Sequence, residues 1–464
     1  MQTAGKPAFI AIFLAPFGFA TLLALLLMVL LPQLVPALNT SAGQDAASTL
    51  SMVQFHQDCL RLGELPHWNP HINGGVPFLA QWKTMTLYPP ALLCLVLPLK
   101  WALPVFSLLH LWWAGLGMYF LARHRTGNNL AAATVGSAFA GFGFVLDFGA
   151  WSGSLAAFGW MPWVILATEK AWREGWQTIL LATVVGALQM LTGGLEMILL
   201  TWTIASAWWL GQLIRSAAKG LSPEPAQNKS DGSAGETPAA RCWAMLWRFP
   251  LVAALTVSLT LPQLLPFFDL VARSQSEMAF APRREALLKV IGLGQTNYPP
   301  VITAGQKPVF LDDAQALDAL KQNTFDGGAV VFLPVDEKPL VTVSNATSAK
   351  VLDAKYGVNW VSIEAMAAEP SLIFVAQSWH HNWGVEVDGQ PARVLRADVA
   401  FQAVEIPAGT HQIHLFYQDR WFLLGAGISF CMAVNCLFAC LLMLIRQFTS
   451  PAPPEPESEE DGFF

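Results

Sequence analysis

Long stretches without charge dominate the chain and predict membrane-spanning helices. No charged residue occurs between Lys6 and Asp45, and the apolar run at residues 8–38 exceeds the roughly 20 residues that cross a bilayer. Because the apolar core of a cleaved signal peptide has only about 7–15 residues, this run predicts an uncleaved first span. Seven further windows raise the expected number of spans to eight: residues 101–122, 130–146, 155–168, 177–195, 197–214, 249–268 and 422–445.

The distribution of Lys and Arg predicts the orientation of these spans, because cytoplasmic connections carry an excess of positive charge. With the N-terminus inside, eleven basic residues lie on the cytoplasmic side: Lys6, Arg123, Arg125, Lys170, Arg173, Arg215, Lys219, Lys229, Arg241, Arg248 and Arg446. The outer connections before residue 249 hold only Arg61, Lys83 and Lys100. Both termini are therefore expected in the cytoplasm, including an acidic tail at residues 447–464.

Three polar regions interrupt the apolar pattern. Residues 39–90 form a long first external loop within a bundle expected over residues 1–272, and the Pro/Gly/Ser-rich residues 216–240 are typical of a flexible cytoplasmic linker. Residues 273–421 are long enough for a small external domain before the last span, which is expected over residues 422–446.

The external domain is expected to be rich in β-structure from about residue 341. Runs rich in Val, Ile, Phe and Trp occur at residues 340–345, 359–366, 372–379, 383–395, 401–409 and 411–418. Asp388-Gly389 predicts a hairpin turn and residues 407–409 a second turn, so the pattern favours a small β-sandwich. Residues 312–323 are typical of a short exposed helix.

Histidines in this domain are weak candidates for a metal site. His380 and His381 are adjacent and His411 and His414 lie three apart, so in regular strands neither pair points two side chains to one face. Ordinary surface histidines are the favoured interpretation.

Composition agrees with a polytopic membrane protein. The chain is 54% hydrophobic, its mean hydropathy is +0.44 and only 12% of its residues are charged, whereas soluble domains have about 25%. A net charge of −6 without a basic block argues against a nucleic-acid partner. The six cysteines show no CxxC spacing, which argues against a structural zinc site.

The first external loop has the most distinctive sequence. Residues 48–62 predict an amphipathic helix that lays Leu50, Val53, Leu60 and Phe55 on the membrane. Pro and Gly then recur at a density that fixes a non-helical loop. Its aromatic residues suit the headgroup level: Phe55, Trp68, Phe78, Trp82 and Tyr88. The alternative is a loop that simply packs on the bundle.

The segment GELPHWNPHINGGVPFLAQWKTMTLYPP resembles the first external loop of the YfhO-like bacterial membrane proteins, which belong with the GT-C type glycosyltransferases. The stretches AGFGFVLDFGAWSGSLAAFGWMPWVILA and LQMLTGGLEMILLTW are similar to later spans of that family, and residues 375–429 are similar to its C-terminal β domain and following span. Typical members are longer, with more spans before the β domain. The resemblance covers roughly residues 8–272 and 341–445.

The resemblance implies sugar transfer from a polyprenyl-phosphate donor on the external face of a bacterial cell membrane, to a surface glycan, polymer or protein. It also implies a carboxylate base in the first external loop, for which Asp45 is the best match and Asp58 the alternative. Asp45 has a second interpretation, as a cap of the 48–62 helix.

Further candidates lie at the same outer ends. Asp147 and Glu196 could join Asp45 in holding a divalent cation such as Mg²⁺ or Mn²⁺, or could shape an acceptor site; related enzymes include metal-dependent and metal-independent members. Substrate and phosphate contacts are expected from the loop: Arg61, His67, Trp68, Asn69, His71 and Lys83. Arg61 and Lys83 could instead bind lipid headgroups.

Two other functions compete with glycosyl transfer. A transporter or flippase of a lipid-linked precursor is less favoured, because no internal repeat is visible and the candidate acids lie at the outer rim. A non-catalytic assembly protein would use the β domain as a binding module.

Overall fold

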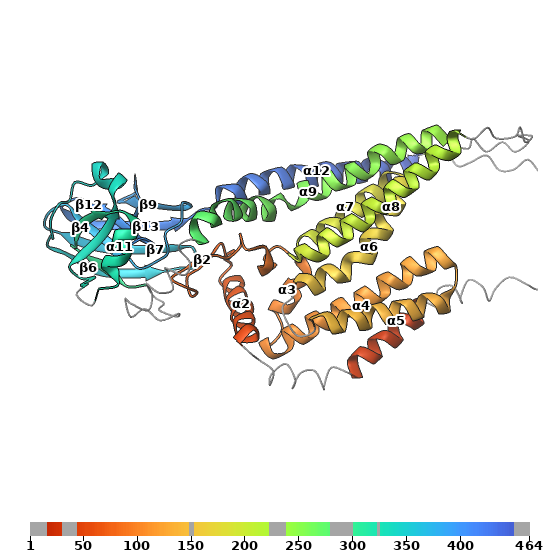
Figure 1. Ribbon diagram of the computed structural model, residues 1–464, viewed down its shortest axis with the longest axis horizontal. Helices are drawn as coiled ribbons and strands as arrows, with labels where there is room; N and C mark the ends of the chain where they lie inside the picture. The colour runs from red at the N-terminus through yellow and green to blue at the C-terminus, as the bar shows by residue number, and fades with distance from the viewer. Residues whose placement is uncertain are drawn as a thin grey trace, which may run out of the picture.

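The computed structural model describes residues 16–29, 44–147, 153–221, 238–278, 300–322 and 325–449. A helical bundle and a β domain lie at opposite ends of an elongated molecule (Figure 1). The bundle consists of the helix Pro16–Val29, α4 (Leu99–Thr126), α5 (Asn129–Asp147), α6 (Gly153–Arg173), α7 (Trp176–Met190), α8 (Leu195–Leu221), α9 (Pro238–Met278) and α12 (Arg420–Thr449).

A helix therefore overlaps every apolar window of the sequence. Four of the described helices contain a segment long and apolar enough to cross a membrane: Trp101–Thr126, Leu195–Ala218, Cys242–Arg273 and Arg420–Met443. The helices Pro16–Val29 and Trp176–Met190 are apolar but shorter. The membrane character of the chain agrees with the sequence.

Close helix contacts in the bundle depend on small residues. A Cβ added at Gly425 of α12 would lie 2.5 Å from the carbonyl oxygen of Leu261 in α9, so only glycine permits this approach. One turn further along α12, Ser429 Oγ donates a hydrogen bond to the Leu259 carbonyl at 2.8 Å. Through these contacts α12 returns along α9 after the chain leaves the β domain.

The β domain is a sandwich of two antiparallel sheets, as the strand pattern predicted. The five-stranded sheet has the order β10 (Gln390–Ala392), β9 (Trp383–Val387), β13 (Gly409–Tyr417), β7 (Trp360–Ala367), β6 (Ala349–Tyr356). The four-stranded sheet has the order β11 (Leu395–Ala397), β12 (Phe401–Ile406), β8 (Ser371–Val375), β3 (Ile302–Ala304). The predicted hairpin joins β9 and β10 through Asp388 and Gly389, whose φ values are +52° and +76°.

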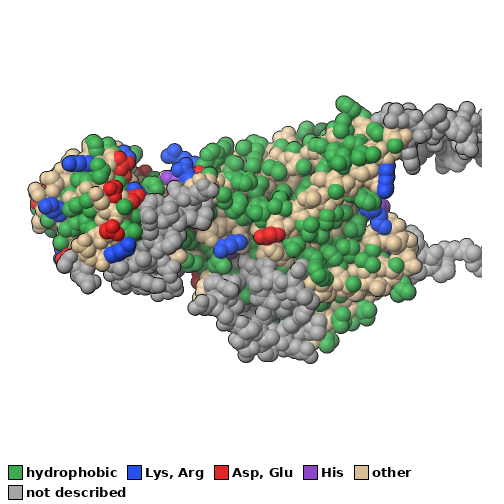
Figure 2. All heavy atoms as spheres, viewed as in Figure 1, with side chains coloured by type: hydrophobic (Ala, Val, Ile, Leu, Met, Phe, Trp, Pro, Cys, Tyr) green, Lys and Arg blue, Asp and Glu red, His purple; other side chains and the backbone are tan. Residues whose placement is uncertain are grey.

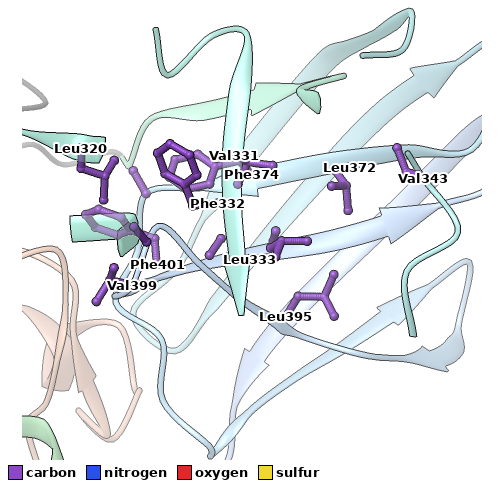
Figure 3. Close-up of a cluster of buried hydrophobic side chains, with 14 residues drawn as sticks. Leu320, Val331, Phe332, Leu333, Val343, Leu372, Phe374, Leu395, Val399 and Phe401 are labelled. Atoms are coloured by element: carbon purple, nitrogen blue, oxygen red, sulfur yellow. The ribbon is translucent and has the colours of Figure 1, made fainter. Parts of the chain in front are cut away.

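A third layer covers the outer face of the four-stranded sheet. The parallel strands β4 (Lys307–Leu311) and β5 (Val330–Pro334) are connected through α11 (Asp313–Leu320). Figure 3 shows side chains of this layer, such as Leu320 and Phe332, meeting Phe374 and Phe401 of the sheet in one apolar cluster.

Three predictions for the β domain are wrong in detail. Residues 340–345 form no strand, and the missing edge strand is β6. Helix α11 is amphipathic rather than simply exposed, because it buries Leu317 and Leu320. His380 is not a surface residue, since only 4% of it is exposed.

The first external loop of the sequence lies between the bundle and the β domain (Figure 1). It contains α2 (Gln44–Arg61) and then a connecting loop, residues 62–88, with the short elements β1 (Trp68–Asn69), β2 (Val76–Pro77) and η1 (Trp82–Thr84) before α3 (Pro89–Leu95). The placement of its aromatic residues at the headgroup level is wrong, because all five are buried inside the protein: Phe55, Trp68, Phe78, Trp82 and Tyr88. Val53 is likewise buried rather than laid on a membrane, whereas Leu60 is exposed. The side chain of Leu50 lies outside the described residues.

Contacts with both halves of the molecule explain this burial. On the bundle side, Trp82 Nε1 donates to the Met190 carbonyl at 2.7 Å and Gln263 Nε2 donates to the Leu79 carbonyl at 2.8 Å. On the other side, Trp68 joins the core between the two sheets of the sandwich. The connecting loop therefore packs against both the bundle and the β domain. The alternative interpretation of the loop had expected the packing on the bundle.

Charge separates the two halves of the surface. In Figure 2 hydrophobic side chains cover most of the visible face of the bundle, whereas acidic and basic side chains gather on the β domain.

Candidate functional site

Helix α2 carries a stripe of polar residues along one face. Ser51, Gln54, Asp58 and Arg61 recur at intervals of three and four positions, and all four are exposed. On the opposite face, Phe55, His56 and Cys59 are buried, and Phe55 and Cys59 pack against Phe78 of the connecting loop. The amphipathic helix predicted from the sequence is thus present, with its apolar side turned to protein.

The polar stripe borders a groove with a volume of about 690 Å³. We call it the α2 groove. It has three walls: α2 itself, the turn between β1 and β2, and the turn between β6 and β7. Its lining residues are Ser51, Gln54, Phe55, Asp58, Cys59, Leu62, Asn69, His71, Ile72, Asn73, Tyr356, Gly357 and Val358.

Three of the residues predicted for the site meet in this groove. Asp58 is 52% exposed and its Oδ1 lies 3.1 Å from Nη1 of Arg61, one turn further along α2. Asn69 is buried and its Oδ1 accepts a hydrogen bond from the backbone N–H of His71 at 3.0 Å. Desolvation lowers the pKa of His71 below its usual value, against a smaller opposing effect of Asp58, so the imidazole is neutral at neutral pH.

The glycine pair of the loop motif has a steric reason. A Cβ added at Gly75, where φ is +110°, would lie 2.4 Å from the ring of Trp68. Asn73 and Gly74 also have positive φ values, and Ser378 of the β domain donates its N–H to the Gly74 carbonyl at 2.7 Å. This turn therefore presents Asn73 to the groove while its other side rests on the sandwich.

His67 and Trp68 do not line the α2 groove. Trp68 is 1% exposed, and its ring packs 5.4 Å from Trp383 and 5.0 Å from Tyr417. The ring of His67 lies 4.8 Å from Phe422, and burial lowers its pKa to about 4. Both side chains join parts of the protein together, which differs from the expected contact with substrate.

Lys83 and Glu196 lie elsewhere at the same end of the bundle. Lys83 is exposed in η1, and Glu196 is exposed in the first turn of α8. The turn that precedes α8 brings the two elements together, because a Cβ at Gly193 would lie 2.4 Å from the Trp82 carbonyl oxygen. These two residues are separate from the cluster around Asp58.

The side chains of Asp45 and Asp147 lie outside the described residues. By backbone position, Asp45 is the second residue of α2 and Asp147 is the last residue of α5. Asp45 precedes Asp58 by 13 helical positions, which separates the two by about 20 Å along the axis. The two acids therefore cannot act at one point. Among the described residues, no group of three His, Cys, Asp or Glu side chains could hold a metal ion.

A second, smaller groove lies on the other side of the polar stripe. Its volume is about 400 Å³, and its lining combines α2 with the turn before α4: Gln54, Gln57, Asp58, Arg61, Val96, Leu97 and Pro98. Gln57 Nε2 fixes that turn by donating to the Leu97 carbonyl at 3.1 Å. Gln54 and Asp58 line both grooves, so Asp58 stands on the ridge between them.

A polar cluster at the bundle–domain junction lies apart from both grooves. Toward the C-terminal end of α9, Asp269 Oδ2 lies 2.9 Å from His381 Nε2 and its Oδ1 lies 3.0 Å from Arg273 Nε. His380 is buried beside His381, and burial lowers its pKa to about 3. We interpret the contacts of this cluster as holding α9 against the loop before β9.

Sequence reasoning missed the contribution of the β domain to the α2 groove. Tyr356 and Val358 lie almost 300 residues beyond α2, and no local pattern marks them as partners of that helix. Gln54 and Asn73 were also missed, although the three- and four-residue spacing of polar residues on α2 could have indicated Gln54.

No family model, curated protein or solved structure matches this chain.

Proposed function

We propose that this protein is a membrane glycosyltransferase that moves a sugar from a polyprenyl-phosphate donor to an acceptor at the outer face of a bacterial cell membrane. The observation that carries the proposal is the position of Asp58, on a ridge between the α2 groove, which offers both polar and apolar side chains, and a second groove with an apolar wall. A transferase needs such an arrangement, because its base must reach the acceptor while the donor lies close by.

The proposed topology has eight spans with both termini in the cytoplasm. It is supported by the alternation of the helices, which places the ends at Asp147, Gly153, Leu195 and Arg420 on the side of the β domain. The opposite ends carry Arg125 and Lys170, in agreement with the charge bias of the sequence. Asp58 and the β domain then both face the outside.

The proposed reaction is a direct displacement at the anomeric carbon of the donor sugar. The carboxylate of Asp58 takes the proton of the acceptor hydroxyl, and the acceptor oxygen forms the new bond to that carbon. The bond between the carbon and the phosphate oxygen breaks, and its electron pair leaves with the polyprenyl phosphate. Arg61, which also lines the second groove, is positioned to stabilise the added negative charge.

Asp45 remains the alternative base, because the resemblance favours its position and its side chain is outside the described residues. A divalent cation bound by Asp45, Asp147 and Glu196 remains a separate proposal. The described residues support Asp58 as the base, because they include its partner Arg61 and the lining of both grooves.

The direct test measures donor consumption. The full-length protein in lipid nanodiscs is incubated with a panel of radiolabelled polyprenyl-phosphate sugars and a mixture of neutral and anionic oligosaccharide acceptors, and released polyprenyl phosphate is quantified. We expect one donor to be consumed, and the D58N variant to be slower by about 10²–10⁴-fold, the usual contribution of a positioned base. D318N is the matched control, because Asp318 pairs with Lys321 on α11 with the same three-residue spacing and lies outside the grooves.

A non-catalytic assembly protein is the second candidate. The burial of His67 and Trp68 favours it, since two residues expected to contact substrate instead hold the bundle and the β domain together. Failure of every donor in the panel, with a correctly folded protein, would favour this second function.

A further inference from the structure

One wall of the α2 groove is supplied by the β domain. The turn between β6 and β7 contributes Tyr356, Gly357 and Val358 to the lining, and Val358 packs against Phe55 and Cys59 of α2. A ligand that reaches Asp58 through this groove must therefore also pass the β domain.

Hydrogen bonds hold this wall at a fixed position. The side chain of Asn359, the next residue, accepts from the Trp68 N–H at 3.1 Å and donates to the Leu65 carbonyl at 2.9 Å. The Gly357 N–H closes the turn on the Trp360 carbonyl at 2.9 Å, and a Cβ at Gly357 would lie 2.1 Å from the Trp360 ring. These hydrogen bonds hold the wall in place without a ligand.

The charge of the described lining favours an uncharged ligand. Asp58 is the one acid among the described lining residues, and Arg61 at its edge offsets that charge. His71 is neutral because burial lowers its pKa. The Asp58 carboxylate would repel an anionic polymer, and no additional cation among these residues would offset the repulsion.

The remaining lining combines two kinds of surface. Side-chain amides and a hydroxyl come from Gln54, Asn69, Asn73 and Ser51, while apolar surface comes from Phe55, Leu62, Ile72 and Val358. A sugar ring presents the same combination, with hydroxyl groups at its edge and C–H groups on its faces. The volume of about 690 Å³ lies within the usual range of about 300–1,000 Å³ for small-molecule sites.

We infer that the α2 groove binds a neutral saccharide acceptor and that the β6–β7 turn, through Tyr356 and Val358, selects it. The role of the saccharide as acceptor rests on the proposed function. The inference restricts the acceptor to uncharged glycans. It also makes the β domain a part of the binding site.

Equilibrium binding to the full-length protein in detergent tests the inference without a donor. The neutral probes are maltotriose, cellotriose and chitotriose, and the anionic probes are trigalacturonate and a glycerol-phosphate trimer, each measured by saturation-transfer NMR and titration calorimetry. The variants are Y356A and V358W, the second of which fills the groove. K355A is the matched control, because Lys355 is the neighbouring residue, is 75% exposed and does not line the groove.

We expect at least one neutral probe to bind, with each anionic probe at least 10-fold weaker. Y356A should weaken binding about 10-fold, V358W should abolish it, and K355A should leave it unchanged. Because Tyr356 and Val358 also pack against buried clusters, binding is measured well below the unfolding temperature of each variant. Absence of binding by all neutral probes, equal binding of anionic probes, or wild-type binding by both groove variants would overturn the inference. Saccharide binding without donor consumption would contradict only the proposed function, whereas donor consumption with wild-type binding in both variants would contradict only the inference.

Discussion

Asn359 and Trp68, 291 positions apart in the sequence, are joined by a hydrogen bond of 3.1 Å from the Trp68 N–H to the Asn359 side-chain oxygen. The same side chain donates to the Leu65 carbonyl. One residue of the β domain thus fixes the connecting loop on the side that leads to α2.

Replacement of Asn359 should loosen this connection in a graded way. N359A removes both hydrogen bonds and leaves two partly buried backbone groups without them, at a cost of about 1–3 kcal/mol each. N359D keeps the acceptor for the Trp68 N–H and should be less destabilising. Thermal unfolding followed by tryptophan fluorescence measures both. Equal stability of N359A and the wild-type protein would contradict the role assigned to Asn359.

Trp68 should be essential for the stability of the β domain, although it belongs to the connecting loop. W68A removes a ring that is 1% exposed between Trp383 and Tyr417, and truncation of a buried Trp typically costs about 3–5 kcal/mol. We expect a marked decrease in the unfolding temperature. Removal of the exposed Trp243 on α9 by W243A is the control and should have little effect. A W68A protein as stable as W243A would show that the contact is dispensable.

The two candidate bases give opposite patterns in the donor assay. If Asp58 is the base, D58N loses about 10²–10⁴-fold in rate, whereas D45N retains most activity because Asp45, the second residue of α2 and not its N-cap, then takes no part in proton transfer. If Asp45 is the base, the two results exchange. Full activity in both variants would leave Asp147 and Glu196 as the remaining candidates for the base.

The buried carboxyl of Asp398 should make stability depend on pH. Burial raises its pKa to about 7, although its Oδ1 accepts the Phe332 N–H at 2.8 Å. Because an unfolded Asp titrates near pH 4, the folded protein retains a proton between about pH 4 and pH 7 that the unfolded chain loses. The contribution of this group to stability is therefore present below about pH 4 and is lost as the pH rises to about 7.

The measurement compares D398N with the wild-type protein by thermal unfolding at pH 5 and pH 8. Asn is neutral and tolerates the φ of +45° at this position, so D398N should be more stable than wild type at pH 8, and the difference should be about one third as large at pH 5. The shift of about three pKa units corresponds to an effect on the order of 4 kcal/mol. An identical pH dependence of the two proteins would contradict the prediction.

The topology can be tested by cysteine labelling in intact cells. Single cysteines are placed by S230C in the predicted linker at residues 216–240, whose ends lie in α8 and α9, and by K338C in the β domain, in a background without native cysteines. An impermeant thiol reagent should label K338C only, because the proposed arrangement puts the linker in the cytoplasm. Labelling of S230C from outside would overturn the orientation and with it the external site.

The sequence predicted the helices and the sandwich well, because their patterns are local. Uncharged windows marked the bundle helices, and the alternating strands around Asp388 marked the β9–β10 hairpin. The edge strand β6 was missed because Lys350, Asp353 and Lys355 dilute its apolar pattern, which is how exposed sheet edges resist pairing with other chains.

The site was only partly predictable, because its walls meet through contacts distant in sequence. Asp58, Asn69 and His71 were named from the loop, and they do meet in one groove. Trp68 was expected at a membrane surface because the local sequence of a short loop does not distinguish an aromatic residue covered by lipid from one covered by protein. The distinguishing partners, such as Tyr417, lie about 350 residues away.

The insertion of Trp68 into the sandwich also sets an order of events during synthesis. A ribosome releases α2 and the connecting loop long before it releases β7, β9 and β13, which together surround the Trp68 ring. Until those strands emerge, the loop has no hydrophobic core to enter and the β6–β7 turn does not yet exist. Chains halted before residue 417 therefore lack a completed groove, so maturation of the site waits for nearly the whole length to be translated.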